Sequence, residues 1–273
     1  MNHTNHRFLL SILTGFLVVL SSNELWALDE TIMAEVPKHQ EATRDLPNDS
    51  IEQKPYAFQF KKLPTHLGAD LRESFWGVQG LYFLTAMGAS MAWYPLDQEI
   101  ADYFSSSPWF SSQLNRSWGH VSSPFAIGGS LFLTWGAAYW TQNKKLAVSM
   151  EAALEAWGLS MAMVAATKFA TGRTRPDGSS YSFPSAHTAS IFSTATVLAN
   201  FYGYSVGIPA YALSVFTALT RMDGNKHFLT DVLVGAVLGT AIGIGTSKAH
   251  RGEKQYSVMP WISTDGVGLS YEF

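Results

Sequence analysis

The sequence predicts an all-α protein, a bundle of about six helices with its candidate functional site at one end, followed by a short C-terminal β-hairpin. Three observations predict this architecture. Long stretches carry no Lys, Arg, Asp or Glu, Gly and Pro stand between them, and the last residues alternate in polarity. Long apolar stretches without alternation favour helices, whereas alternation after a turn signal favours a hairpin.

The composition excludes several classes of protein. Only 14% of the 273 residues are charged, 47% are hydrophobic and the net charge is −3, which disfavours both disorder and nucleic-acid binding. Cysteine is absent, which excludes disulfide scaffolds and cysteine nucleophiles. A mean hydropathy of +0.05 lies between a soluble domain and a multi-span membrane protein, and therefore leaves the environment of the helices open.

The first 69 residues are expected to precede the folded domain. Residues 1–27 are predicted to be a secretory signal peptide, because Arg7 precedes an apolar run, 8–20, and Ala27 is a suitable last residue before cleavage. An uncleaved anchor is the alternative, but this run is short for a span of about 20 residues. Residues 28–69 hold four prolines and scattered charges without a period, which is typical of a linker or arm.

Residues 70–250 are expected to form the helical domain. The longest uncharged run, 188–220, is too long for one helix, and Gly203, Gly207 and Pro209 divide it. Gly235, Gly239 and Gly243 then recur one turn apart, a spacing that lets helices approach closely. The helices are expected at 70–95, 122–141, 145–170, 186–202, 207–221 and 226–248.

The environment of these helices is only partly predictable. Uncharged runs of about 20 residues, with Trp and Tyr near their ends, favour membrane association. Ser, Thr, Gly and Gln dilute every run, which is the argument for a soluble bundle, but membrane association is the favoured interpretation. The tail, 251–273, is expected to form a hairpin that packs on the bundle, since Asp265-Gly266 is a turn signal and alternate residues from Val267 to Phe273 are apolar.

Three short segments carry the residues with distinctive chemistry, and each lies at the end of an expected helix. The links 168–187 and 221–227 are separated by two helices. Because successive antiparallel helices reverse direction, both links fall at the same end of the bundle. The residues brought together are Lys168, Arg175, Ser185, Ala186, His187, Arg221, His227 and Asp231.

Their chemistry points to a bound oxyanion. Arg175 and Arg221 can grip oxygens bidentately, while Lys168 acts as a point charge. The start of the helix at 186 adds N–H donors and a favourable dipole. His227 precedes Asp231 by four residues, so on a helix the carboxylate can orient one ring nitrogen and leave the other free to attack.

In this order and spacing, the segments Lys168-x6-Arg175-Pro, Pro-Ser185-Ala-His187 and Arg221-x5-His227-x3-Asp231 resemble the three signature motifs of the type 2 phosphatidic acid phosphatase superfamily. That superfamily also contains bacterial class A acid phosphatases and vanadium-dependent haloperoxidases. The sequence departs from the usual pattern at Ala186, where Gly is common, and at Thr220, where Ser is common. Ala keeps the backbone N–H and Thr keeps the hydroxyl, so activity is expected to survive.

The resemblance implies a role for each residue. His227 would attack phosphorus and become a phosphohistidine, oriented by Asp231, and His187 would protonate the leaving oxygen and then activate water. The non-bridging oxygens would be held by Lys168, Arg175, Ser185, the N–H of Ala186 and Arg221. No cofactor and no metal is implied, and the sequence contains no HExxH or paired-carboxylate spacing that would bind a metal.

The expected function is hydrolysis of a phosphate or pyrophosphate ester, with a lipid phosphate as substrate and the membrane as partner. The protein is expected to be exported to the bacterial cell envelope with its site facing the periplasm. Three alternatives stay open: a soluble periplasmic acid phosphatase of broad specificity, a vanadium-dependent haloperoxidase, and a non-catalytic anion-binding protein. The sequence does not predict the oligomeric state, the individual lipid or which membrane is involved.

Overall fold

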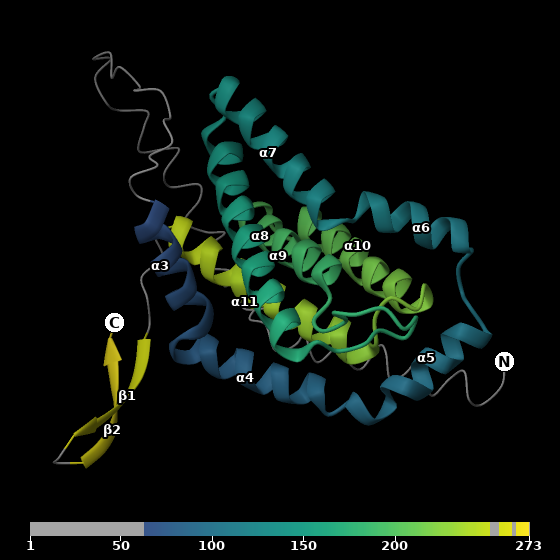
Figure 1. Cartoon of the computed structure of the whole chain (residues 1–273). Helices are drawn as coiled ribbons and strands as arrows, with labels where there is room; N and C mark the ends of the chain where they lie inside the picture. The colour runs from purple at the N-terminus through teal and green to yellow at the C-terminus, as the bar shows by residue number, and fades with distance from the viewer. Residues whose placement is uncertain (1–62, 252–256, 264–265, 273) are drawn as a thin grey trace.

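The computed structural model describes residues 63–251, 257–263 and 266–272, so the predicted signal peptide and most of the predicted arm lie outside the described residues. The described part confirms the all-α prediction (Figure 1). Its helices are α3 (Leu63–Phe75), α4 (Gly77–Met91), the 3-10 turn η3 (Tyr94–Leu96), α5 (Asp97–Ser106), α6 (Ser112–Val121), α7 (Pro124–Trp140), α8 (Lys144–Thr171), α9 (Ala186–Tyr202), α10 (Tyr204–Asp223) and α11 (Leu229–Arg251).

Helix α11 is the centre of the bundle and packs against α9, α3, α8 and α4. Its close approach to α9 depends on glycine. A Cβ at Gly235, Gly239 or Gly243 would lie 2.8, 2.3 or 2.7 Å from a backbone oxygen of α9 or its N-cap, closer than side chains tolerate. This confirms the close packing predicted from the four-residue glycine spacing. The tight contact holds the starts of α9 and α11 side by side.

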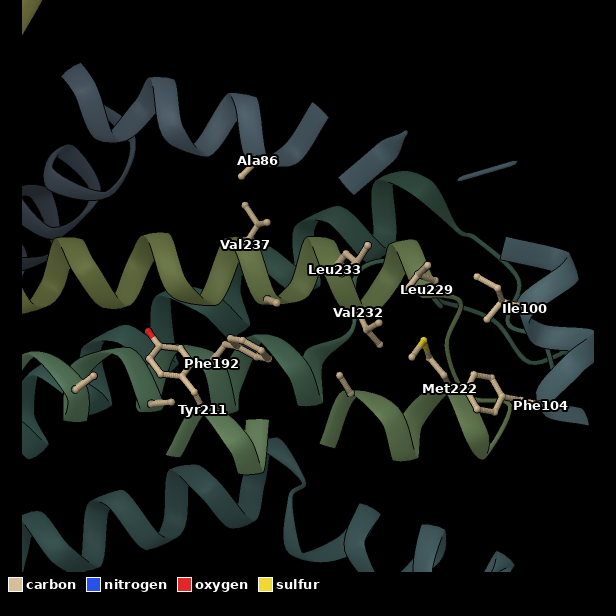
Figure 2. Close-up of a cluster of buried hydrophobic side chains, with 14 residues drawn as sticks. Ala86, Ile100, Phe104, Phe192, Tyr211, Met222, Leu229, Val232, Leu233 and Val237 are labelled. Atoms are coloured by element: carbon tan, nitrogen blue, oxygen red, sulfur yellow. The ribbon is translucent and has the colours of Figure 1, made fainter. Parts of the chain in front are cut away.

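A buried apolar cluster fixes the site-bearing end of α11 (Figure 2). Leu229, Val232 and Leu233, all fully buried, form its α11 side. Phe192 of α9 and Met222 of α10 pack against them. Ile100 and Phe104 join from α5 and Ala86 from α4, opposite Val237. Burial of apolar surface contributes about 25 cal/mol per Å² to the free energy of folding, and here it fixes the end of α10 against the start of α11.

The N-terminal part of the domain differs from the prediction. Helix α3 begins at Leu63, inside the expected arm, and the single helix expected at 70–95 is broken at Trp76, whose backbone is extended (φ −111°, ψ 159°). The break lets α3 turn onto α11, where a Cβ at Gly245 would lie 2.1 Å from Ser74 Oγ. This contact between distant segments has no signature in the local sequence.

Two helices, α5 and α6, were not predicted at all. Both are short and carry polar residues, so neither forms an uncharged run. Pro95 lies in the turn η3 that leads into α5, and Ser111 caps α6 by accepting a hydrogen bond from the N–H of Leu114 at 3.2 Å. Such capping residues are the signal that marks a short helix in the sequence.

The starts of the last two helices also differ from the prediction. Helix α10 begins at Tyr204 and continues through Pro209, its sixth residue, where the missing N–H removes one backbone hydrogen bond. Helix α11 begins at Leu229 rather than at 226. His227 therefore lies in the loop before α11 and not on its face.

The outer surface of the bundle is unusually apolar. Large apolar side chains that should be buried in a soluble protein are instead exposed on α4, α7, α8 and α10. Trp140 and Phe125 at the two ends of α7 are 88% and 87% exposed. The others of this kind include Leu81, Leu84, Phe132, Leu133, Phe169, Ile208 and Leu213. Among the described helices only α11 has the length and composition of a membrane span, and 94% of its most apolar window is buried inside the bundle.

After α11 the chain forms two paired strands, β1 (Ser257–Ser263) and β2 (Gly266–Glu272). They are antiparallel, with Ser257 opposite Glu272 and Ser263 opposite Gly266. This is the segment expected to form a hairpin, and the two residues between the strands lie outside the described part. Strand β1 comes close to α4.

Candidate active site

The structure gathers all eight predicted site residues at one end of the central helices, where the loops 172–185 and 224–228 meet (Figure 1). An ion pair between Lys226 Nζ and Asp177 Oδ2, 2.7 Å apart, ties the two loops together. The residues are Lys168 near the end of α8, Arg175 in the first loop, Ser185, Ala186 and His187 at the start of α9, Arg221 near the end of α10, His227 in the second loop and Asp231 in the first turn of α11.

His227 and Asp231 form the pair expected from their spacing, but through a different local geometry. The Nδ1 atom of His227 lies 3.6 Å from Asp231 Oδ2, and both side chains are buried. The same carboxylate oxygen accepts a 2.9 Å hydrogen bond from the N–H of Phe228. Asp231 thus reaches back over the start of α11 to hold the loop and the ring it carries. The other ring nitrogen, Nε2, makes no hydrogen bond to any described residue.

The second histidine is fixed by a helix that the sequence did not predict. His187 Nε2 lies 3.1 Å from the backbone oxygen of Gly119 in α6. A protonated Nε2 donates this hydrogen bond, which sets the ring's orientation and leaves Nδ1 as the second nitrogen. Helix α6 is in turn anchored to α10, because Trp118 Nε1 donates to Thr217 Oγ1 at 3.0 Å.

Arg221 lies directly against the same helix. Its Nη1 would be only 2.8 Å from a Cβ added at Gly119, so glycine leaves room there for the guanidinium in its observed position. The Nε–H of Arg221 is buried and has no hydrogen-bond partner among the described residues. A buried donor without an acceptor costs free energy unless a ligand supplies one, and this donor therefore marks an oxyanion position.

Two further cations complete the cage. Lys168 Nζ donates to the backbone oxygens of Tyr181 and Ser182, the latter at 3.2 Å. Arg175 Nε donates to the backbone oxygen of Ser180 at 3.2 Å, which leaves its two Nη groups without a partner among the described residues. Backbone oxygens thus hold both side chains in place, and each side chain keeps N–H donors for a ligand.

The start of α9 presents backbone donors toward the same region. Ser185 is the fully buried N-cap, and its Oγ accepts from the N–H and the hydroxyl of Thr188, at 3.4 and 3.0 Å. Its own hydroxyl proton therefore stays available for a ligand. The N–H of Ala186, the first helical residue, is one of the donors that a helix leaves unsatisfied, at the positive end of the helix dipole.

Mutual proximity perturbs the pKa values of the cluster. Burial and then the charge of Arg175 lower the pKa of Lys168 to about 8. Burial, followed by the charge of Arg221, lowers the pKa of His187 to about 3. Burial likewise lowers the pKa of His227 to about 4, although Asp231 opposes the shift. All three shifts disfavour the positively charged form of the side chain. A bound anion would favour that form and so raise each pKa again.

A cavity of about 680 Å³ opens between α6 and the end of α10 and reaches the site at His187 and Arg221. Its α6 wall is a polar stripe at helical spacing. The residues of this stripe are Ser112, Asn115, Arg116, Gly119 and His120, and Ser123, the N-cap of α7, continues it. Neither Arg116 nor His120, both exposed, is paired with another described residue. The cavity is large enough for a polar head group beyond the phosphate itself.

Sequence reasoning missed Arg173 and Asp97, which lie behind Asp231. Arg173 Nη1 is 2.8 Å from Asp231 Oδ1, and its Nη2 is 2.7 Å from Asp97 Oδ2. Arg173 stands only two residues before Arg175, and from the sequence alone either arginine could be assigned to a phosphate contact. Asp97 is 76 residues away, and its only signal is a buried charge in the first turn of a short helix.

A separate polar group lies away from this site, at the other end of α11. One ligand atom each of Asp70, Glu155 and His250 lies within 4.8 Å of the others. These residues come from α3, α8 and α11, so they show no metal-binding spacing in the sequence. They are remote from the phosphate-binding residues and take no part in the chemistry assigned to that end.

Taken together, the geometry provides candidates for a nucleophile, an acid–base group and an oxyanion cage. The imidazole of His227 is oriented by a carboxylate, the ring of His187 is fixed by a backbone oxygen, and the unpaired donors between them are cationic or at a helix N-terminus. Donors placed where charge develops stabilise a transition state without reorganising. This combination suits transfer of a phosphoryl group to histidine and then to water.

Comparison with known proteins agrees with this chemistry. Over 116 residues the chain is 37% identical to the Lipid A 1-phosphatase of Porphyromonas gingivalis, which is 40% of this chain and 24% of that protein. It is 27% identical over 97 residues to the Lipid A 4'-phosphatase of Helicobacter pylori, which is 33% of this chain and 48% of that protein. The chain thus spans a quarter to a half of the length of these relatives.

Two solved structures are similar to the chain. The transmembrane PAP2-type phosphatidylglycerolphosphate phosphatase from Bacillus subtilis matches with a TM-score of 0.46 and 23% identity, over 64% of this chain and 95% of that one. LpxE from Aquifex aeolicus matches with a TM-score of 0.46 and 22% identity, over 56% and 95%. The family model of the PAP2 superfamily matches residues 81–254, which include every residue of the cage and both histidines. The chain therefore belongs to the PAP2 superfamily.

Proposed function

We propose that the protein is a lipid phosphatase that releases inorganic phosphate through a phosphohistidine at His227. The observation that carries the proposal is the pairing of His227 Nδ1 with Asp231 Oδ2, 3.6 Å apart. The Nε–H of Arg221, which has no partner among the described residues, lies at the same end of the bundle. A purely structural histidine would not need a carboxylate on one nitrogen and an oxyanion cage beside the other.

In the first step, Nε2 of His227 attacks phosphorus and the bond from phosphorus to the ester oxygen breaks. His187 gives its proton to the leaving oxygen. Asp231 stabilises the positive charge that develops on the ring of His227. In the second step, His187 removes a proton from water, the oxygen of that water bonds to phosphorus, and the bond to Nε2 breaks. Inorganic phosphate leaves and His227 is neutral again.

The low pKa of His187 fits this scheme only with an anionic substrate. At about 3 in the free protein, the ring is neutral at pH 7 and cannot act as an acid. Burial is the main cause of this low pKa, and the charges of Arg221 and Arg175 lower it further. A phosphate dianion beside the ring offsets those charges and so raises the pKa toward the working pH. Substrate binding then supplies the protonation state that the first step requires.

The exposed apolar surface supports a lipid substrate. Side chains such as Phe125, Leu133 and Trp140 on α7 are more than 70% exposed and would face water in a soluble protein. Seated against acyl chains, this surface would place the site near the membrane interface, where a lipid phosphate lies. The matched regions of two lipid A phosphatases add support for this substrate class. Export to the cell envelope and a periplasm-facing site belong to this proposal.

Phosphate release from a panel of substrates tests the proposal. Purified full-length protein in detergent is assayed with phosphatidic acid, a phosphorylated glycolipid, an isoprenyl pyrophosphate and a soluble aryl phosphate. The expected result is a kcat/KM at least about 10-fold higher for one of the lipids, because each buried CH₂ of a chain contributes about 0.8 kcal/mol. Equal rates on the aryl phosphate, with full activity in the soluble fraction, would favour a broad-specificity acid phosphatase. Peroxide turnover with halide and vanadate, without phosphate release, would favour a haloperoxidase.

A further inference from the structure

Behind the nucleophile, the structure contains a buried chain of charges that the phosphate chemistry does not use. Arg173 donates from Nη1 to Asp231 Oδ1 at 2.8 Å and from Nη2 to Asp97 Oδ2 at 2.7 Å. Both carboxylates are at least 96% buried, and the side chain of Arg173 is 19% exposed. A guanidinium shared between two buried carboxylates is expensive to desolvate, so its retention calls for a function.

Arg173 is directed away from the phosphate cage. Gly172 ends α8 in the left-handed conformation (φ 55°), which turns the chain sharply before Arg173. The guanidinium then lies against the rings of Phe228 and Tyr94, at 4.3 and 5.0 Å from their centroids. Besides the two carboxylates, Nη1 of Arg173 donates a hydrogen bond to Thr230 Oγ1 at 2.9 Å. Arg175, two residues later, has the opposite arrangement, with its Nη groups unpaired.

Asp97 holds this guanidinium in place and is itself locked. It accepts a 2.9 Å hydrogen bond from the N–H of Thr230 in the first turn of α11 and another from the hydroxyl of Thr230. Helix α5 is thereby fastened to the residue next to Asp231. The arrangement is a built scaffold between two segments, 97 and 230, that are distant in sequence.

The charges of this chain are balanced in a way that matters for His227. Arg173 alone would neutralise Asp231 and weaken its attraction for the imidazolium that forms as His227 attacks. Because Asp97 offsets Arg173, the three groups keep one net negative charge beside the ring. Oδ1 of Asp231 is occupied by Arg173, so Oδ2 is the atom that faces His227.

We propose that Arg173 and Asp97 form a positioning unit for the nucleophile: Arg173 fixes the rotamer of Asp231, and Asp97 keeps the negative charge of that carboxylate available to His227. This inference rests on the proposed function, since it assigns the unit to the same nucleophile. It makes α5, a helix outside the three sequence motifs, part of the catalytic apparatus.

The isosteric variant Asp97→Asn and the shorter, neutral variant Arg173→Gln test the proposal, together with the double variant and Lys144→Gln as a charge-removing control. Lys144 is exposed at the far end of α8 and makes no contact with the site. Each single variant is expected to lower kcat about 10- to 100-fold. The affinity for inorganic vanadate, measured by thermal shift without turnover, is expected to change less than about 3-fold, because the cage is untouched.

The pH profile gives the readout that a merely structural role would not move. The groups facing His227 are Asp231 from α11, Lys168 from α8, His187 from α9 and Arg175 from the loop. Removing the positive charge in Arg173→Gln should move the acidic limb of kcat/KM, which reports protonation of His227, to higher pH. Removing the negative charge in Asp97→Asn should move it to lower pH. The double variant should return it toward the wild-type position.

The outcomes separate this inference from the proposed function. Shifts of opposite sign with vanadate affinity retained support the positioning unit. Shifts of the same sign, or a loss of vanadate affinity equal to the loss of kcat, overturn it while leaving the phosphatase intact. If Arg173→Gln does not fold, the profile of Asp97→Asn decides alone, and an unshifted limb overturns the inference. A wild-type protein that releases no phosphate from any substrate overturns the proposed function itself.

Discussion

The fit of Arg221 against Gly119 yields the sharpest prediction, because the two residues contact each other without any bond between them. A Cβ at position 119 would lie 2.8 Å from Nη1 of Arg221, whereas ordinary contacts begin near 3.4 Å. In Gly119→Ala the guanidinium must therefore shift by about 0.6 Å. Displacements of about 1 Å at a reacting centre cost about 100-fold in rate. We expect kcat/KM to fall about 10- to 100-fold.

The same substitution should not destabilise the protein. Among the described residues, only the flexible end of the Arg221 side chain lies within reach of the new methyl group. Ala is also favoured over Gly inside a helix by up to about 1 kcal/mol. The melting temperature should stay equal or rise while turnover and vanadate affinity fall together.

Gly129→Ala is the matched control, because a Cβ there meets nothing within 4 Å. This variant should keep wild-type kcat/KM. Steady-state kinetics on the best lipid substrate and thermal unfolding make the comparison. If Gly119→Ala keeps full activity, Arg221 does not hold a phosphate oxygen at the position inferred here, and the role of α6 in the site is wrong.

Further variants and conditions probe the remaining parts of the site. His227→Ala should reduce kcat more than 100-fold with the fold retained by circular dichroism, since no described neighbour can replace the nucleophile; activity above a hundredth of wild type would count against it. Arg175→Lys should weaken vanadate inhibition despite the conserved charge, because the planar fork is lost; an unchanged inhibition constant would place Arg175 outside the cage. EDTA should leave kcat unchanged, because cations and a helix N-terminus supply the positive charge; loss on chelation with rescue by a divalent ion would contradict this. The pKa of His187 is about 3 in the folded state, below its unfolded value near 6.5. Between these two pH values the unfolded state binds more protons than the folded state. The free energy of unfolding should therefore fall as the pH drops through that window. His187→Gln should reduce this slope in thermal unfolding, and an unchanged slope would show that His187 is not buried as a neutral ring.

Much of the site could be predicted from the sequence because its members lie at helix ends. Lys168, the start of α9 and Arg221 follow from where uncharged runs stop, and antiparallel packing brings those ends together. The glycine spacing in α11 correctly predicted a close helix–helix contact, and the structure shows that the partner is α9. These inferences depend on local pattern and chain direction only.

What the sequence could not predict depends on contacts between distant segments. The alignment of His227 with Asp231 was expected from helical spacing, yet the ring lies in a loop and the carboxylate reaches back to it. Helix α6 was missed because its polar face, which lines the cavity, breaks the uncharged pattern. Asp97 was missed because its partner, Arg173, is 76 residues away, and a single buried carboxylate has no periodicity.

The central claim, that His227 carries the phosphoryl group, is tested most directly by trapping that intermediate. Full-length protein is mixed with its best ³²P-labelled lipid substrate and quenched at alkaline pH within milliseconds, and the modified peptide is identified by mass spectrometry. The account predicts an acid-labile phosphoryl group on His227 that forms and decays at rates compatible with kcat, and none in Asp231→Asn quenched at the same time. A label on any other residue, or turnover at the wild-type rate with no phosphohistidine formed, would contradict it.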